Sequence, residues 1–162
     1  MELIQTFTFE KLSLMVQQAL QKSVKLWYVP DEAIIITSIN DKEVIPTFKS
    51  YLIKISPSES GFENKIPRIG NHYRNIYVID IELWVKSSGK LTQRLLDGKI
   101  EINKGIYEFY KDVSDVLEHN NFDGQLNPYA GSSINNPILL KSDDTQTEGI
   151  GFIWLGNQYN TK

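Results

Sequence analysis

The longest pattern in the chain is an apolar stripe between Leu91 and Leu117. Apolar residues and one glycine recur there in steps of three and four, and most residues between them are charged or amide side chains. The stripe comprises Leu91, Leu95, Gly98, Ile102, Ile106, Phe109, Val113, Val116 and Leu117. This spacing predicts one face of a long amphipathic helix. We expect the helix to continue through Gly98 and Gly105, and a break into two helices at Asp97 and Gly98 is the alternative.

The N-terminal region contains a second pattern of the same kind. Apolar residues recur at three and four positions from Phe9 to Lys22, with Lys, Glu and Gln on the other side. Thr8 stands immediately before them, and a threonine there can accept a hydrogen bond from a free N–H of the first turn. This pattern predicts a helix over residues 9–22 with Thr8 as its N-cap.

Shorter segments are typical of strands because they are rich in β-branched residues or alternate with period two. They are Ala33–Ile39, Tyr51–Ile55, Ile76–Val85, Pro137–Leu140 and Ile150–Leu155. In the longest, four aliphatic residues from Ile79 to Val85 alternate with Asp80, Glu82 and Trp84. One face is therefore expected in the core and the other at least partly in water, which favours an antiparallel sheet.

Two long stretches, residues 56–75 and 127–136, contain Gly, Pro, Asn and Ser without periodicity, and residues 156–162 form a polar C-terminal tail. Connections of this length are often functional, so the first is the expected interaction surface. The order of elements predicts a single α+β domain over residues 1–162. Its sheet is mainly antiparallel, with an N-terminal helix and one long central helix packed on one face.

Composition excludes several classes of function. The chain has 162 residues, a formal net charge of −3 and no cysteine, so disulfides, thiolate metal sites and cysteine nucleophiles are absent. The charge gives no global attraction to nucleic acid. No apolar run approaches the roughly 20 residues of a membrane-spanning helix, and the N-terminus lacks the pattern of a signal peptide. We expect a soluble protein without a membrane partner.

Candidate chemistry is sparse. His72 and His119 have no second ligand at the spacing of a metal motif, and phosphate loops and nucleophile elbows are absent. Asp80 and Glu82 share one face of a strand and could hold a divalent cation, although a solvated strand face explains them equally. We therefore expect no catalytic residue, cofactor or metal. A small metal-dependent hydrolase that uses Asp80 and Glu82 is the alternative.

The segment Lys65–Arg74 combines cations with an aromatic residue. Single-stranded nucleic acid can be bound by such residues through stacking and phosphate contacts. Arg and Tyr are also enriched at protein interfaces, and we favour that interpretation. A regulatory domain that binds a peptide or nucleic acid through the 56–75 loop is the third possibility.

The order of elements resembles that of the tail terminator, or tail-completion, proteins of long-tailed bacteriophages. The resemblance lies in the N-terminal helix, the extended segments before a long loop, the strand Ile76–Val85, the following helix and the closing strand Gly151–Leu155. It implies a small α+β subunit without catalytic residues, which forms a hexameric ring at the head–tail neck. Such a ring caps the tail tube and joins it to the head. The polar 127–136 insertion and the length of the 91–117 helix depart from the family.

The resemblance places the chain in the virion, with the host cytoplasm as its location during assembly. Its partners would be further copies of itself, the tail tube and head-completion or connector proteins. Nucleic acid is not expected, except as DNA passing through a ring lumen. A closed ring needs a heterologous contact. We expect the 56–75 loop to face an acidic helix edge of the next subunit, through Phe62, Ile66, Arg68, Ile69, Tyr73 and Arg74 on one side and Asp112, Asp115 and Glu118 on the other.

Overall fold

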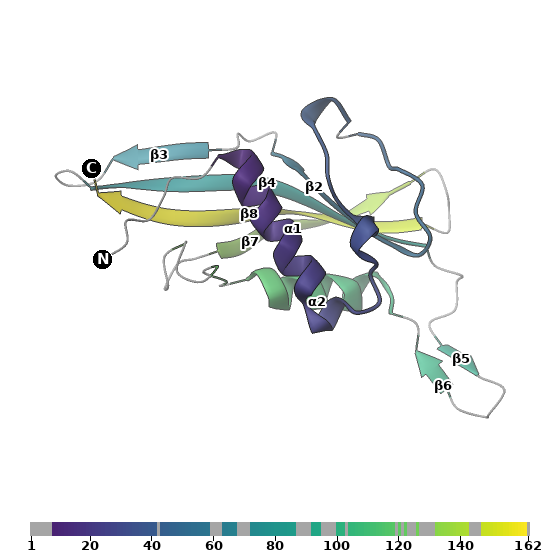
Figure 1. Ribbon diagram of the computed structural model, residues 1–162. Coiled ribbons are helices and arrows are strands. Elements are labelled where there is room, and N and C mark those ends of the chain that lie inside the picture. Colours follow the sequence, from purple (N-terminus) through teal and green to yellow (C-terminus); the bar gives the residue numbers. More distant parts are fainter. Residues whose placement is uncertain are drawn as a thin grey trace.

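A computed structural model describes residues 8–41, 43–58, 63–67, 72–86, 92–94, 100–102, 104–118, 120, 122, 126, 132–142 and 147–161. Within these residues, one mixed sheet carries the helices α1 (Phe9–Lys22) and α2 (Ile106–Leu117). Short 3-10 turns, η1 (Val24–Leu26), η2 (Asp31–Ala33) and η3 (Ile39–Asp41), flank the first strand. The predicted α+β class is confirmed, and Figure 1 shows both helices on the same side of the sheet.

The sheet has the order β1-β2-β4-β8-β7, and β3 also pairs with β4. The strands are β1 (Ile34–Ile36), β2 (Tyr51–Pro57), β3 (Glu63–Pro67), β4 (His72–Lys86), β7 (Ser132–Lys141) and β8 (Thr147–Thr161). The β1–β2 pair is parallel, and every other pair in this sheet is antiparallel. The sheet is therefore mixed and not purely antiparallel. Most of its strand pairs are antiparallel, which agrees with the expectation of a mainly antiparallel sheet.

One face of the sheet forms the core together with the helices. Cross-strand neighbours align Ile53, Leu83 and Ile150 in one row, and the next row continues with Ile55, Ile81 and Phe152. The two helices cover these rows with fully buried residues, which are Leu12, Val16, Leu20, Phe109, Val113 and Leu117. The prediction that the aliphatic residues of the central strand, from Ile79 to Val85, face the core is thus confirmed.

Helix α1 has the predicted bounds and cap. The Thr8 side chain accepts a hydrogen bond of 3.2 Å from the backbone N–H of Lys11. At the other end, the backbone N–H of Ser23 donates to the carbonyl oxygen of Leu20. These bonds satisfy groups that the helix ends leave without a partner.

The predicted central helix is wrong in its first half. Helix α2 begins at Ile106 with Gly105 as its N-cap, and the preceding chain contains the antiparallel strands β5 (Thr92–Arg94) and β6 (Ile100–Ile102). The stripe positions Leu91, Leu95 and Gly98 lie outside the described residues.

The physical reason lies in competing local preferences. Ile100 and Ile102 are β-branched and alternate with Glu101, which suits a strand. An Asp-Gly pair favours a hairpin turn, and each glycine costs a helix interior about 1 kcal/mol relative to alanine. The three- and four-residue spacing before Ile106 was therefore coincidental.

Three strand segments were not predicted from the sequence, because their residues are mostly polar. Part of the expected 56–75 loop is a hairpin in which β3 pairs with β4, from Glu63 with Tyr77 to Pro67 with Tyr73. Strand β7 begins at Ser132, inside the expected 127–136 insertion, and the expected C-terminal tail belongs to β8 as far as Thr161. These segments are held by main-chain hydrogen bonds to neighbouring strands, which need no apolar alternation.

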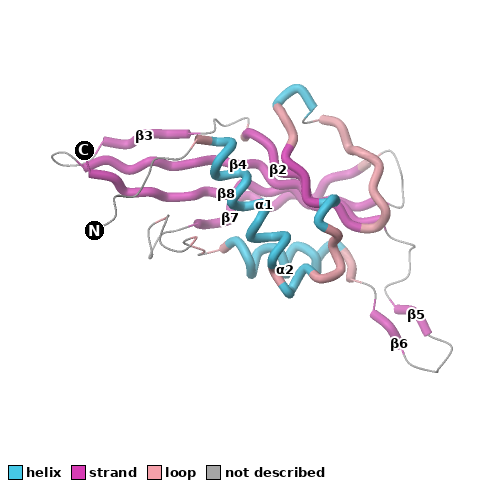
Figure 2. The backbone as a smooth tube through the Cα atoms, in the orientation of Figure 1, coloured by secondary structure: helices cyan, strands magenta, loops and turns pink. Residues whose placement is uncertain are grey.

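Two parts of the structure extend beyond the helix-covered body. Strands β3, β4 and β8 continue past the helices as a flat arm, and β5 with β6 projects from the opposite end (Figures 1 and 2). The β5–β6 pair is a two-stranded sheet of its own. In the part of the chain described here, neither helix has the length and apolar character needed to cross a membrane.

Candidate functional site

The residues predicted to form the subunit interface lie on separate elements. Ile66 belongs to β3 and pairs with Arg74 of β4, next to Tyr73 in the same hairpin. The remaining three from the expected loop, Phe62, Arg68 and Ile69, lie outside the described residues. Of the acidic set, Asp112 and Asp115 are on α2, and Glu118 is its C-cap.

Asp112 is the centre of a hydrogen-bond network within its own chain. Its Oδ2 accepts a bond of 2.7 Å from the Tyr28 hydroxyl and one of 2.9 Å from the Lys104 ammonium. The same ammonium lies 5.1 Å from the centroid of the Tyr28 ring, and the Tyr51 hydroxyl donates to the Lys104 carbonyl oxygen. The network attaches α2, and Lys104 before it, to the segment that follows α1.

The electrostatics of this network follow from the same contacts. Burial by itself raises the pKa of the Asp112 carboxyl, but the hydrogen bonds from Tyr28 and Lys104 outweigh it and hold that pKa below its ordinary value. Burial and the adjacent Asp112 carboxylate both raise the pKa of the Tyr28 hydroxyl far above its ordinary range. Asp112 is therefore ionised and satisfied without a neighbouring subunit.

The other two acids of the helix edge differ from Asp112. Asp115 forms an ion pair of 3.0 Å with Lys25, in which both side chains are exposed. Glu118 is exposed, and within the described part of the chain no cation pairs with it. Two of the three predicted acidic anchors are thus engaged inside the subunit, and their contact with a neighbouring copy stays a prediction.

The Asp80 and Glu82 face is more enclosed than expected. Both residues are half-buried, and Trp84 beside them is buried. Glu82 Oε1 lies 3.7 Å from the ammonium of Lys54, which is only 1% exposed, and accepts a 3.0 Å bond from the Trp84 indole N–H. This face carries an ion pair between a buried lysine and a half-buried glutamate, so it is less solvated than expected at Glu82 but still partly in water.

The same ion pair bears on the metal-dependent alternative. A divalent cation on Glu82 would compete with the buried ammonium of Lys54, and carboxylate sites for such cations use several convergent oxygen ligands. Among the described residues, no group of three or more His, Cys, Asp and Glu side chains converges. The arrangement gives the hydrolase alternative no support.

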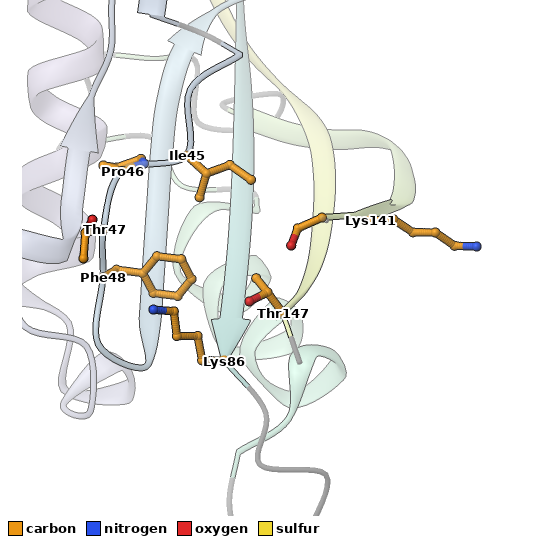
Figure 3. Close-up of a pocket in the computed structure, with 8 residues that line it drawn as sticks. Ile45, Pro46, Thr47, Phe48, Lys86, Lys141 and Thr147 are labelled. Atoms are coloured by element: carbon orange, nitrogen blue, oxygen red, sulfur yellow. The ribbon is translucent and has the colours of Figure 1, made fainter. Parts of the chain in front are cut away.

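A hollow of about 430 Å³ lies between the segment before β2 and the ends of β4, β7 and β8 (Figure 3). Its lining consists of Ile45, Pro46, Thr47, Phe48, Lys86, Lys141, Ser142 and Thr147. The Lys86 ammonium is 4.9 Å from the centroid of the Phe48 ring, whereas the Lys141 side chain points away from the hollow in Figure 3. The hollow offers an apolar wall, hydroxyls and one ammonium, which suit binding rather than acid–base chemistry.

Four exposed aliphatic residues follow one another in the segment that leads to this hollow, and Ile45 itself lines it. Ile39 is 66% exposed and Val44 56%, and Ile36 and Ile45 are also exposed at 37% each. These four residues lie within ten positions along edge strand β1 and the turn after it. Exposed apolar residues grouped in this way mark interaction surfaces more often than single ones do. Sequence reasoning missed them, although apolar residues inside a polar turn were a visible signal.

Comparison of the chain with models of known protein families gave no match, and comparison with curated proteins gave no significant one.

Proposed function

We propose that this chain is a structural assembly subunit of a bacteriophage virion, a tail terminator or head–tail neck protein. It would form a homo-oligomeric ring, a hexamer by its resemblance, that caps the tail tube and joins it to head-completion or connector proteins. In this proposal the chain is not an enzyme and works through its interfaces. It would assemble in the host cytoplasm and remain in the virion, with DNA passing through the lumen.

The projecting β5–β6 hairpin carries this proposal. It is a two-stranded sheet separate from the main sheet and extends away from the body (Figure 2). An isolated two-stranded hairpin is at best marginally stable in water, so it gains most from a surface on another molecule. An assembly subunit supplies such a surface from its neighbour.

Two further observations support an assembly role. Glu82, one of the two carboxylates considered for chemistry, faces the ammonium of Lys54 in the same chain. Helix α2 spans Ile106–Leu117 only. The expected length of the 91–117 helix was one of the two departures from the tail terminator pattern, and the shorter helix removes that departure.

Association of the purified chain tests the proposal. Native mass spectrometry and negative-stain electron microscopy should give hexameric rings, and tail tubes assembled without this protein should each acquire one ring at an end when it is added. A chain that stays monomeric at high concentration and does not bind tube ends would contradict the proposal.

A further inference from the structure

Trp27, directly after the 3-10 turn η1, is a tryptophan exposed to solvent. Its side chain is 78% exposed, and that of Val24, three positions earlier, is 86% exposed. Side chains three positions apart lie on the same side of a 3-10 turn, so the two form one apolar projection. We call this pair the Trp27 knob. Tryptophan is enriched among the residues that dominate binding energy at protein interfaces, so the knob is a candidate anchor.

The Trp27 knob stands on an ordered base. Leu26 and Val29 are buried on either side of it, and the Val29 N–H donates to the Leu26 carbonyl oxygen. The Trp27 ring meets the Tyr28 ring edge-on, with 5.7 Å between their centroids, and the Tyr28 hydroxyl is bonded to Asp112. The backbone of the knob is therefore fixed before any partner arrives, which lowers the entropic cost of binding.

The hollow of Figure 3 has the size and chemistry of a site for an aromatic side chain. Its volume of about 430 Å³ is in the range of pockets that hold small organic molecules, and Pro46 and Phe48 give it an apolar wall. The Lys86 ammonium lies 4.9 Å from the centroid of the Phe48 ring, and no carboxylate pairs with it in the part of the chain that the structure describes. Among aromatic rings the indole attracts a cation most strongly.

The knob and the hollow lie on opposite sides of the sheet. Trp27 is on the helix side, because Tyr28 beside it packs against Phe109 of α2, with 6.0 Å between the ring centroids. Val85 faces the core on that same side, so the pleat of β4 directs the next residue, Lys86, to the other side. The knob of one copy therefore cannot fill the hollow of the same copy.

We infer that the Trp27 knob of one copy docks in the hollow of a second copy of this chain. The two parts are complementary in charge at their centre, since the electron-rich face of the indole meets the unpaired Lys86 ammonium. They are complementary in polarity as well, because the exposed indole N–H can donate to the Thr47 hydroxyl in the lining. One chain thus carries both an exposed anchor and a hollow that suits it.

This contact is heterologous, because the helix side of one copy meets the opposite side of the next. Repetition of such a contact closes a ring or extends a filament. The inference rests on the proposed function, because a ring requires that copies associate. It names a contact different from the one expected at the 56–75 loop.

Tryptophan fluorescence follows the knob directly in the full-length chain. The other two tryptophans, Trp84 and Trp154, are 3% and 0% exposed, so a change in exposure reports on Trp27. When the wild type associates, its emission should shift to shorter wavelength and acrylamide should quench it less. Trp27→Phe should lose this change. Equal quenching of monomer and oligomer would overturn the inference.

Two pairs of matched variants test the two halves of the contact. Trp27→Ala should weaken association at least about tenfold, whereas Tyr107→Ala, on another exposed aromatic residue, should leave it unchanged. Lys86→Glu should also weaken it at least about tenfold, because a carboxylate would then face the electron-rich indole. Lys141→Glu makes the same charge change on a side chain that points away from the hollow, so it should have no effect (Figure 3). Equal effects of the two lysine variants would contradict the inference, and circular dichroism verifies every fold.

A mixture of two variants tests whether the contact is heterologous. Trp27→Ala keeps its hollow and Lys86→Glu keeps its knob, so each variant alone lacks a productive contact. Together they have one, and native mass spectrometry should show a heterodimer with one copy of each and no larger species. A mixture that stays monomeric would overturn the inference, as would Lys86→Glu associating fully on its own.

The outcomes separate this inference from the proposed function. If the wild-type chain forms rings while neither the fluorescence change nor the heterodimer appears, the knob contact is wrong and the ring stands. If both appear but the assemblies do not bind tail tubes, the contact is right and the virion role is wrong. A chain that never associates contradicts both.

Discussion

The Trp84 ring occupies the space that a side chain on Gly149 would need. The two residues are cross-strand partners in β4 and β8. A Cβ added to Gly149 would lie 2.7 Å from Cε3 and from Cζ3 of the indole, closer than carbon atoms approach in proteins. Trp84 is only 3% exposed. The glycine therefore lets the indole lie against the backbone of the neighbouring strand.

Substitution of Gly149 tests this relationship. Gly149→Ala should lower the free energy of unfolding by about 1–3 kcal/mol, because the added methyl must displace a buried ring. Gly151→Ala on the same face of β8 is the matched control, since its nearest contact would be 3.1 Å from Cδ1 of the flexible Leu140 side chain. Urea denaturation of both variants measures the difference, and equal costs would reject the explanation.

Phe109 is the second position with a strong expected effect. Its side chain is fully buried, and its ring meets those of Tyr51 at 5.3 Å and Tyr28 at 6.0 Å between centroids. Phe109→Ala should cost about 3–5 kcal/mol, a large part of a domain's stability. Tyr107→Ala, on the exposed side of the same helix, should change stability by less than about 0.5 kcal/mol. An unchanged thermal midpoint for Phe109→Ala would contradict its place in the core.

The core was predictable because burial imposes a period on the sequence. The four-residue step from Phe109 to Val113 and the alternation from Ile79 to Val85 each report one buried face. The strands of polar sequence were not predictable in this way. The segment from Gly156 to Thr161 is held by pairing with β4, and pairing depends on a strand that is distant in the sequence.

The acidic candidates show a similar limit. Sequence reasoning placed Asp112 on an acidic helix edge and Glu82 on a partly solvated strand face, but each has a partner that is far away along the chain. The Tyr28 bond to Asp112 spans 84 positions. Likewise, Lys54 meets Glu82 only because β2 and β4 are neighbours in the sheet. Charge pairing between distant segments is decided by topology, which a single sequence does not specify.

The ion pair of Lys54 and Glu82 should respond asymmetrically to substitution. Glu82→Gln removes a negative charge that faces the buried Lys54 ammonium, and because Glu82 is 21% exposed the loss should be smaller than the about 3–5 kcal/mol of a fully buried pair but larger than that of Lys54→Met. Lys54→Met keeps the volume, and Glu82 is 21% exposed and still accepts from Trp84, so we expect a loss below about 1.5 kcal/mol. Chemical denaturation compares the two. A larger loss for Lys54→Met would contradict this account.

Asp112 should make the stability of the protein fall at acidic pH. Its pKa is lower in the folded chain than its ordinary value, so the folded state binds fewer protons than the unfolded state when the carboxyl titrates. The stabilisation is thus complete above the ordinary carboxyl pKa of about 3.9 and is lost as the pH falls through the folded value.

Denaturation of the wild type and of Asp112→Asn across this range provides the measurement. At neutral pH the variant should be less stable, because the amide cannot offer a charged acceptor to Tyr28 and Lys104. The difference should shrink as the pH falls below about 4, since the wild-type carboxyl is then protonated too. Asp115→Asn is the control, because its pair with Lys25 is exposed and such pairs contribute about 0–1 kcal/mol. A difference between wild type and Asp112→Asn that is constant with pH would show that the Asp112 carboxylate charge does not stabilise the fold.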